Sequence, residues 1–255
     1  MARKDHYYNK AKQEGYRARA AYKLKQLDAA ENLIEEGDVV VDLGAAPGGW
    51  TEVAAEKVGE EGTVIAVDRQ RVDAIDADAQ VEYVRGDMTD ESTREEVVEI
   101  AGKVDAVVSD MAPNMTGEYN LDHARSAHLA RQAFETALEV LDSGGDFAAK
   151  IFQGQDLEPL REDIDEEFKY VRTMGPDASR DESSEVYLVA KSRLTAPVSA
   201  GDELEVEIED VGSEGDGIAS VEGFRLFVPG AETGETVRVR VDEIKERFGF
   251  AERID

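Results

Sequence analysis

The chain of 255 residues has no cysteine, and aromatic side chains make up only 7% of it. Without cysteine, neither a disulfide framework nor a thiolate metal site is available. No apolar run approaches the roughly 20 residues that a membrane-spanning helix needs. Residues 1–24 lack the apolar core of a signal peptide. We therefore expect a soluble, cytoplasmic protein without a membrane partner, long enough for one α/β domain and a small module.

Basic residues are scarce, since 29 Lys and Arg stand against 58 Asp and Glu, a net charge of −29. Such a field ordinarily repels nucleic acid. The apolar pattern is nevertheless that of a folded protein, so we interpret the acidic excess as the solvated surface of a halophilic protein. The Debye length at 1 M salt is about 3 Å, which screens self-repulsion and also weakens phosphate contacts. An RNA partner would then be held more by shape and stacking.

The few basic residues gather at the N-terminus, in residues 1–25. Only Asp5 and Glu14 oppose them there. The basic residues of this segment are Arg3, Lys4, Lys10, Lys12, Arg17, Arg19, Lys23 and Lys25. Two interpretations are open: the charged outer face of an amphipathic first helix, or an RNA-facing segment. In the second case, Tyr7, Tyr8 and Tyr16 are available for stacking on bases.

The stretch VVVDLGAAPGGW, residues 39–50, is typical of the first strand, glycine turn and helix of a nucleotide-binding α/β domain. Further strands are predicted at 63–68, 81–85, 104–109, 147–152, 169–174 and 185–191. Helices are predicted at 18–30, 49–58, 92–101, 121–141 and 156–167. We expect Ser92 to cap its helix and Gly144-Gly145 to end the long one. The alternation predicts a Rossmann-like, doubly wound parallel sheet whose last strands can run antiparallel.

The pattern changes near residue 192, where runs such as ELEVEIEDV and ETVRVRVDEI begin to alternate with a period of two. Glycine-rich turns, GSEGDG and GAETGE, separate these runs. This pattern predicts a small all-β barrel or sandwich. We therefore expect one domain over residues 1–192 and a second over residues 193–255.

Four carboxylates, Asp42, Asp68, Asp87 and Asp110, end four successive predicted strands. Ligands bind at this edge of such sheets, although any single one of these residues also fits an ordinary strand-end cap. Neither a GxGxxG fingerprint nor a Walker lysine is present. A ligand with a ribose and a positive charge but no pyrophosphate fits an acidic rim, and S-adenosylmethionine is such a ligand.

In this interpretation three of these carboxylates have distinct tasks. Asp68, twenty residues after Gly48, holds the ribose hydroxyls. Asp87 reaches the adenine amino group, and Asp110 lies near the sulfonium. Gly48 gives a close backbone approach, and Trp50 gives an aromatic wall.

Lys150 lies within the apolar stretch FAAKIFQG. Lysine is rarely buried without a partner, and a dry site near another cation favours the neutral amine. Lys150 is therefore a candidate general base, unless its amine simply reaches solvent beyond a buried stem. Lys23 could equally be plain helix surface, and Glu185 a plain strand-edge residue. No metal is expected, because the three histidines do not group as ligands: His6, His123 and His128.

Six separated motifs resemble the FtsJ-type ribosomal RNA 2′-O-ribose methyltransferases over about residues 6–192. The motifs, in order, are GYRARAAYKL, DLGAAPGGW, the strand-end Asp68, SDMAPN, AAKIFQG and SSEVYLVA. The resemblance implies S-adenosyl-L-methionine as methyl donor. It also implies a catalytic set of Lys23, Asp110, Lys150 and Glu185. The cofactor residues implied are Gly48, Trp50, Asp68, Asp87 and Asp110.

Residues from about 194 to 254 resemble the TRAM domain, a small β-barrel of RNA-modifying enzymes. The resemblance implies RNA capture by this part of the chain. Candidate stacking residues are Phe224, Phe227, Phe248 and Phe250, although a core role is equally open for the first two. Together with the acidic composition, this domain indicates a haloarchaeal-like member of the family.

The resemblance therefore implies methyl transfer to the ribose 2′-OH of a uridine in the A loop of 23S rRNA, during ribosome maturation. The expected partner is large-subunit rRNA or the ribosomal subunit itself, and the protein is expected to be a monomer. Two alternatives remain open. One is a tRNA 2′-O-ribose methyltransferase, which the TRAM-like domain keeps possible. The other is a non-catalytic RNA-binding assembly factor, against which the intact set of four residues argues.

Overall fold

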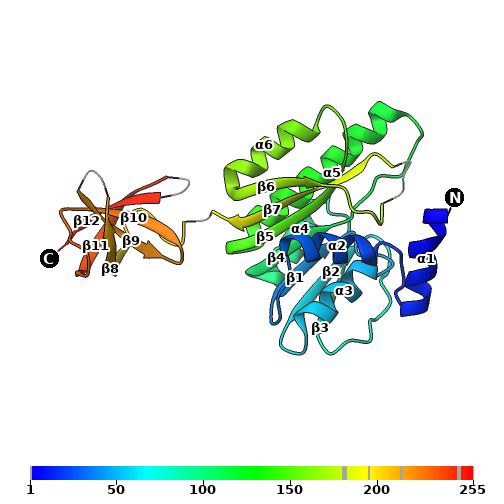
Figure 1. Ribbon diagram of the computed structural model, residues 1–255, viewed down its shortest axis with the longest axis horizontal. Helices are drawn as coiled ribbons and strands as arrows, with labels where there is room; N and C mark the ends of the chain where they lie inside the picture. The colour runs from blue at the N-terminus through cyan, green and yellow to red at the C-terminus, as the bar shows by residue number, and fades with distance from the viewer. Residues whose placement is uncertain (1, 180–182, 195, 213–214, 246–247, 255) are drawn as a thin grey trace. The chain divides into compact units, whose positions relative to one another are not determined.

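The computed structural model describes residues 2–179, 183–194, 196–212, 215–245 and 248–254. The chain forms two compact units, residues 1–191 and residues 192–255. Figure 1 shows a layered α/β unit and a separate small unit made of strands. Each unit has its own apolar core.

The first unit is built on a seven-stranded sheet in the order β3-β2-β1-β4-β5-β7-β6. Its strands are β1 (Val39–Leu43), β2 (Thr63–Asp68), β3 (Gln80–Arg85), β4 (Val104–Ser109), β5 (Leu141–Phe152), β6 (Phe168–Met174) and β7 (Glu185–Arg193). The strands β3, β2, β1, β4 and β5 pair in parallel, whereas β7 pairs antiparallel with β5. The predicted α/β sheet with an antiparallel late strand is thus confirmed.

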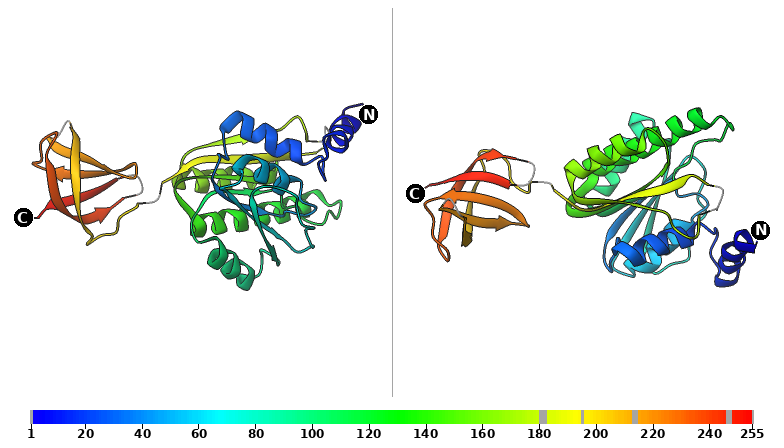
Figure 2. Two further views of the ribbon diagram at one scale, coloured as in Figure 1. Left: turned by 90° about the horizontal axis from the view of Figure 1, so that it is seen from below. Right: turned by 45° about the horizontal axis from the view of Figure 1, so that its top comes forward.

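Helices cover both faces of this sheet, as Figure 2 shows. They are α1 (Ala2–Glu14), α2 (Ala21–Glu31), α3 (Gly49–Val58), α4 (Glu91–Ala101), α5 (Tyr119–Val140) and α6 (Leu157–Glu167). In β1, Val40 packs into the cluster under α2 and α3, while Val41 and Leu43 pack into the cluster under α4, α5 and α6. This alternation is the period-two pattern of a strand buried on both faces.

Some predicted helix boundaries were wrong, beginning with α2, which was expected from residue 18 but begins at Ala21. The N-cap residue of α4 is Asp90, whose extended backbone (φ −90°, ψ 129°) precedes the helix, so Ser92 lies inside it. Asp and Ser are both good N-cap residues, and residue type alone does not decide between them. The long helix α5 ends at Val140, and β5 begins directly at Leu141. Gly144 and Gly145 therefore lie within β5, beside a register shift in its pairing with β4.

The second unit is a closed barrel in the order β10-β12-β11-β8-β9. Its strands are β8 (Glu203–Val211), β9 (Asp216–Val221), β10 (Phe224–Pro229), β11 (Thr236–Ile244) and β12 (Phe248–Arg253). Alternate apolar residues of these strands point inward and form one core cluster. Closure leaves the barrel without an exposed sheet edge. The predicted small all-β barrel is confirmed.

Candidate active site

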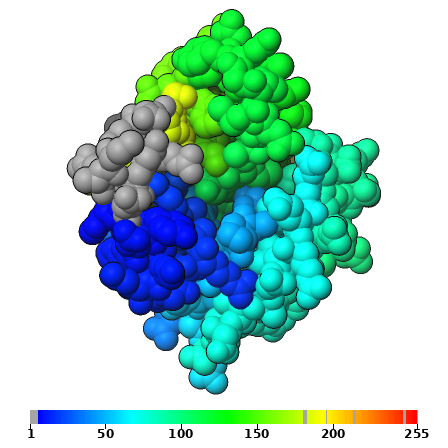
Figure 3. Space-filling view, turned by 90° about the vertical axis from the view of Figure 1, so that its right-hand side faces the viewer, coloured from blue at the N-terminus to red at the C-terminus, as the bar shows by residue number. Residues whose placement is uncertain are grey.

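The carboxyl ends of β1, β2, β3 and β4 open into a cleft of about 820 Å³. Figure 3 shows a hollow on the face where N-terminal segments, the segments around β2 and the α5 region meet. Asp68 ends β2, Asp87 follows β3, and Asp110 follows β4, and all three line the cleft. Parallel strands present their carboxyl ends at one sheet edge, so these three predicted residues come together there.

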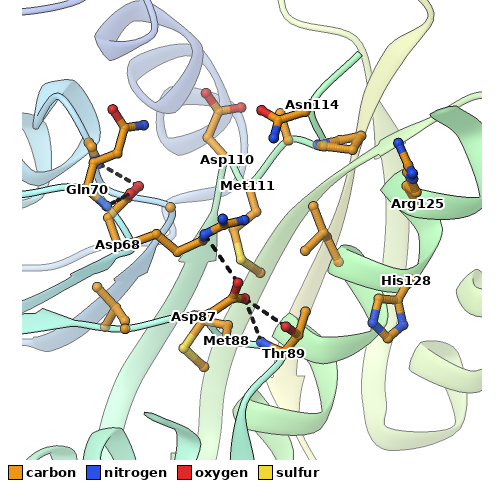
Figure 4. A pocket seen from close by; sticks show the side chains of 18 residues that line it. Asp68, Gln70, Asp87, Met88, Thr89, Asp110, Met111, Asn114, Arg125 and His128 are labelled. Carbon is orange, nitrogen blue, oxygen red and sulfur yellow. Dashed lines mark hydrogen bonds and ion pairs between the residues drawn. The ribbon is translucent and has the colours of Figure 1, made fainter. Parts of the chain in front are cut away.

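Two of these carboxylates are held by the backbone around them, as Figure 4 shows. Asp68 accepts hydrogen bonds from the amides of Ala46 (3.0 Å) and Gln70 (2.7 Å). Asp87 accepts from the amide (3.1 Å) and hydroxyl (2.8 Å) of Thr89. The pKa of Asp87 lies below its ordinary value despite partial burial. The largest cause is the hydrogen bond from the Thr89 backbone amide, followed by the hydrogen bond from the Thr89 hydroxyl and the charge of Arg69. Asp87 therefore stays ionised.

Gly48 and Trp50 lie outside the residues that line this cleft. Gly48 precedes α3 with φ 114°, a conformation that glycine adopts at little cost. The indole of Trp50 is only 2% exposed, donates to the carbonyl of Ala20 (2.8 Å) and packs on Tyr187. Trp50 thus belongs to the core under α2 and α3, and its contact to a cofactor stays a prediction.

Beside the cleft, Lys150 and Asp110 form a close ion pair. The Lys150 ammonium lies 2.8 Å from Asp110 Oδ1 and 2.5 Å from the Asp110 carbonyl oxygen. The Lys150 side chain is 5% exposed and that of Asp110 is 17% exposed. Lys150 lies in β5 and Asp110 follows the neighbouring strand β4, so the parallel pairing of the two strands brings them together. Lys150 is thus a buried lysine whose amine has a partner.

Lys23 and Glu185 complete a cluster of four charged residues. Lys23, from α2, lies 2.8 Å from Glu185 Oε1 and 3.7 Å from Asp110 Oδ1. Burial is the largest influence on Asp110 and by itself would raise its pKa. The charges of Lys150 and Lys23, together with the hydrogen bonds from Lys150 and Tyr187, outweigh burial, so the pKa of Asp110 falls below its ordinary value. All four residues of the predicted catalytic set are brought together, with Asp110 at the centre.

Tyr187 is a fifth member of this cluster that the sequence analysis missed. Its hydroxyl donates to Asp110 Oδ1 at 2.6 Å, and the Lys23 ammonium lies 5.7 Å from its ring centre. Burial, and then the negative charges of Asp110 and Glu185, raise the pKa of Tyr187 well above its ordinary value, so its hydroxyl remains a donor. The signal was its spacing, since residues two apart in a strand share a face and Tyr187 follows Glu185 by two.

The fourth strand-end carboxylate, Asp42, lies below the cleft instead of lining it. It is fully buried, and its Oδ2 accepts from the hydroxyl of Thr51 at 2.7 Å. Its Oδ1 is buried and has no hydrogen-bond partner among the described residues. Burial raises the pKa of Asp42 to about 7. This residue couples the end of β1 to α3 through Thr51.

The histidines of α5 differ in their surroundings. His128 lines the cleft, whereas His123 is buried, stacks on Tyr119 (4.2 Å between ring centres) and packs near Phe152. Over the described residues, no group of three or more His, Cys, Asp or Glu side chains has the arrangement of a metal site. The same part of the chain has no helix that is long and apolar enough to cross a membrane.

Several basic residues of the N-terminal segment contact the protein itself. Lys25 lies 3.5 Å from Glu56 and Lys10 lies 3.8 Å from Glu14. Arg19 donates to the carbonyl of Ala178 at 2.6 Å. Arg17 is bound to the segment after β2 and to α3. The positive charge of residues 10–25 is therefore partly used within the fold.

The barrel carries an aromatic cluster on its outer surface. Phe227, Phe248 and Phe250 have ring centres 5.5 to 5.9 Å apart, and Phe250 is 36% exposed. Phe227 and Phe250 are register partners on the neighbouring strands β10 and β12. Phe224, in contrast, is 5% exposed and belongs to the barrel core. Of the two residues for which a core role was open, Phe224 lies in the core and Phe227 lies on the outside.

Each of the two units matches a known protein family or domain. The model of FtsJ-like methyltransferases matches residues 16–193, and the TRAM domain model matches residues 197–254. A crystal structure described as a putative ribosomal RNA methyltransferase from Plasmodium falciparum is 26% identical, with a TM-score of 0.62. It covers 71% of this chain and 100% of its own.

Full-length relatives share both units. Proteins named ribosomal RNA large subunit methyltransferase E are 65% identical in Natronomonas pharaonis and 62% identical in Haloarcula marismortui, with 100% of each chain covered. The protein of that name from Methanosarcina mazei is 45% identical, over 98% of this chain and 92% of its own. The acidic composition fits the haloarchaeal relatives. The chain belongs to the FtsJ-like methyltransferase family and carries a C-terminal TRAM domain.

Proposed function

We propose that the protein transfers a methyl group from S-adenosyl-L-methionine to the 2′-oxygen of a ribose in large-subunit rRNA. By family resemblance, the nucleotide is a uridine of the A loop. The observation that carries the proposal is the cluster of Lys23, Asp110, Lys150 and Glu185 beside an acidic cleft. The names of the full-length relatives support the choice of large-subunit rRNA.

The residues of the cleft fit this methyl donor. Asp68 ends β2, the position from which a carboxylate takes ribose hydroxyls in this fold. Asp87, kept ionised by Thr89 and Arg69, can accept from the adenine amino group. Asp110 supplies negative charge that favours a sulfonium. When bound, the donor supplies an electrophilic methyl group on a positively charged sulfur.

Lys150 is the proposed general base. Asp110 offers two acceptors to the Lys150 nitrogen, its carbonyl oxygen at 2.5 Å and its Oδ1 at 2.8 Å. To act as a base, Lys150 must first release the proton of its ammonium form to solvent. The neutral amine then has two N–H groups and one lone pair, so the two bonds donated to Asp110 leave the lone pair free for the 2′-hydroxyl proton. Asp110 thereby aims the amine. With the donor bound, the proton would pass from the ribose oxygen to Lys150 Nζ as the C–O bond forms and the methyl–sulfur bond breaks, so that the donor would leave as neutral S-adenosyl-L-homocysteine.

Lys23, Glu185 and Tyr187 are proposed to position the ribose and Asp110. The 2.8 Å pair between Lys23 and Glu185 fixes two polar groups at the edge of the cluster. The Tyr187 hydroxyl holds Asp110 Oδ1 in place. Since much of the rate of a displacement comes from alignment of the attacking atom, methyl group and leaving atom, we assign a large part of the rate enhancement to this rigid network.

The aromatic cluster of the barrel is the proposed RNA contact of the second unit. Phe227, Phe248 and Phe250 offer flat apolar surface, and stacking on bases is less sensitive to salt than phosphate contacts are. This mode of binding suits a chain with a net charge of −29. The exposed Tyr8 of α1 is a further candidate for stacking.

Deletion of the gene, followed by mapping of ribose methylation across rRNA and tRNA, tests the proposal. We expect one 2′-O-methyl group to be lost, at a uridine in the A loop of large-subunit rRNA. Loss of a tRNA site instead would assign the tRNA alternative. An unchanged methylation map would remove the enzyme assignment in favour of an RNA-binding assembly factor. Complementation with the wild-type gene is the control.

A further inference from the structure

Arg17 lies between α1 and α2, in the motif GYRARAAYKL that also supplies Lys23. Its guanidinium donates to two consecutive carbonyl oxygens, those of Asp73 and Ala74, each at 2.5 Å. Its Nε lies 3.0 Å from Glu52 Oε1, and its backbone amide donates to Glu52 Oε2 at 2.9 Å. A side chain that electrostatics alone would assign to RNA thus makes three contacts within the protein, through Nε, Nη1 and Nη2.

The segment that Arg17 holds, residues 69–79, connects the parallel strands β2 and β3 without a helix or strand of its own. Parallel neighbours are usually joined through a helix that satisfies the backbone of the crossover. Here side chains from outside the segment do part of this work. Besides Arg17, the hydroxyl of Tyr83 accepts from the Ile75 amide at 2.8 Å, and Arg85 donates to the Arg69 carbonyl at 3.3 Å.

This segment is part of the cleft wall. It begins directly after Asp68, and Arg69 and Gln70 line the cleft. The middle of the segment lies against the glycine turn. If Gly48 carried a Cβ, that atom would lie 3.5 Å from Ile75 Cδ1. The same Cβ would lie 3.2 Å from Arg17 Cδ and 3.3 Å from Arg17 Nη1. Arg17, Ile75 and Gly48 therefore pack together at one point beside the cleft.

We propose that Arg17 is a positioning residue for the methyl donor. Arg17 does this by holding segment 69–79 against the glycine turn and α3. This inference rests on the proposed function, since it takes S-adenosyl-L-methionine as the ligand of the cleft. The donor site is then formed in part by the N-terminal segment, the same segment that brings Lys23 to the reaction centre. Arginine suits the task because its planar fork reaches two carbonyls and a carboxylate together, which lysine does not.

The test measures donor affinity and RNA affinity separately, on the full chain in multimolar KCl. We expect Arg17→Gln to weaken S-adenosyl-L-methionine binding about tenfold or more, the loss associated with hydrogen bonds to a charged group. The KM for the donor should rise similarly, whereas kcat at saturating donor should stay within about threefold of the wild type. RNA affinity should stay near the wild-type value. Arg17→Lys should restore only part of the donor affinity.

Arg19→Gln is the matched control, because it removes the same charge two residues away from a side chain that contacts Ala178. It should leave donor affinity within about twofold. Wild-type donor affinity in Arg17→Gln would overturn the proposal, as would a loss of RNA affinity alone. If Arg17→Gln does not fold, Arg17→Lys serves with hydrogen exchange, where amides of residues 69–79 should exchange faster. Failure of the wild type to bind the donor would instead contradict the proposed function.

Discussion

In the methyltransferase unit, ionisable side chains such as Lys23, Asp42 and Lys150 are buried. In the described strands β8–β12 of the barrel, the buried side chains are apolar and the ion pairs, such as Arg240 with Glu203, lie outside. Burying a charge is costly unless it is paired. This difference fits the proposal that Lys23 and Lys150 act inside the first unit and that the barrel contacts RNA through its outer surface.

The largest effect is expected from Lys150→Ala, which removes the proposed base. Methyl transfer should fall by about 10³-fold or more, a loss typical of a missing general base. Donor affinity should stay nearly unchanged, because Asp68 and Asp87 are untouched. Single-turnover methylation and equilibrium binding of S-adenosyl-L-methionine measure the two quantities.

Lys191→Ala is the matched control for this change. Lys191 pairs with Asp146, and it lies six residues along β7 from Glu185, about 20 Å in an extended strand. Its loss should affect stability and leave the rate of methyl transfer close to that of the wild type. Methylation at the wild-type rate by Lys150→Ala would contradict the role of the buried pair.

The second effect concerns Asp42 and the pH dependence of stability. Its folded-state pKa of about 7 is raised from an ordinary value near 3.8, so the folded protein holds this proton more tightly than the unfolded chain. The contribution of Asp42 to the free energy of unfolding is therefore fully present at low pH and is lost as the pH rises through about 7. Between about pH 5.5 and about pH 8.5, the loss is about 2 kcal/mol.

Comparison with Asp42→Asn isolates this contribution, because the amide does not titrate. Denaturant unfolding at several pH values, at constant KCl, should show a smaller fall for the variant than for the wild type. Equal slopes would mean that Asp42 is not held in its neutral form. The other titrating groups are common to both proteins.

A smaller effect is expected from Tyr187→Phe, which deletes one donor to Asp110 and keeps the ring that packs on Trp50. A hydrogen bond to a charged acceptor is worth enough that kcat should fall about tenfold. The packing volume is conserved, so the melting temperature should fall by no more than the loss of one hydrogen bond explains. An unchanged kcat would show that Lys150 and Lys23 hold Asp110 without help.

The smallest effect is expected at the barrel surface. Phe250→Ala should weaken RNA binding about fivefold, at the lower end of the loss for one stacked base, with little change in stability. Phe224→Ala, the matched change on the other side of the same sheet, should cost about 3 to 5 kcal/mol of stability. RNA binding and denaturant unfolding of both variants measure this contrast. The opposite pattern would assign the aromatic cluster to packing.

The sequence predicted the central strands of the first unit because they are buried apolar runs, as in Val39–Leu43. Asp68, Asp87 and Asp110 could be placed together because parallel strands share a carboxyl edge. The grouping of Lys23 and Glu185 with them came from the family resemblance alone. Lys23 belongs to a helix outside the sheet, and no local pattern specifies where that helix packs.

Contacts made through side chains could not be predicted in the same way. Arg17 belongs to a basic run, yet it binds two carbonyl groups more than fifty residues away in the chain. Trp50 follows a glycine turn, yet its ring is buried against Tyr187. Phe224 and Phe227 are three positions apart, so they point to opposite sides of β10. The sequence alone does not say which of these sides is the inner face of the barrel.

The position of β7 in the sheet has a consequence for the order in which the protein matures during synthesis. β7 lies between β5 and β6, although it is the last strand of its unit to be made. A nascent chain that ends before Glu185 already contains Asp68, Asp87, Asp110 and Lys150 but lacks Glu185 and Tyr187. We expect such a chain to acquire donor binding before it acquires turnover, with β7 insertion as the late, non-local step.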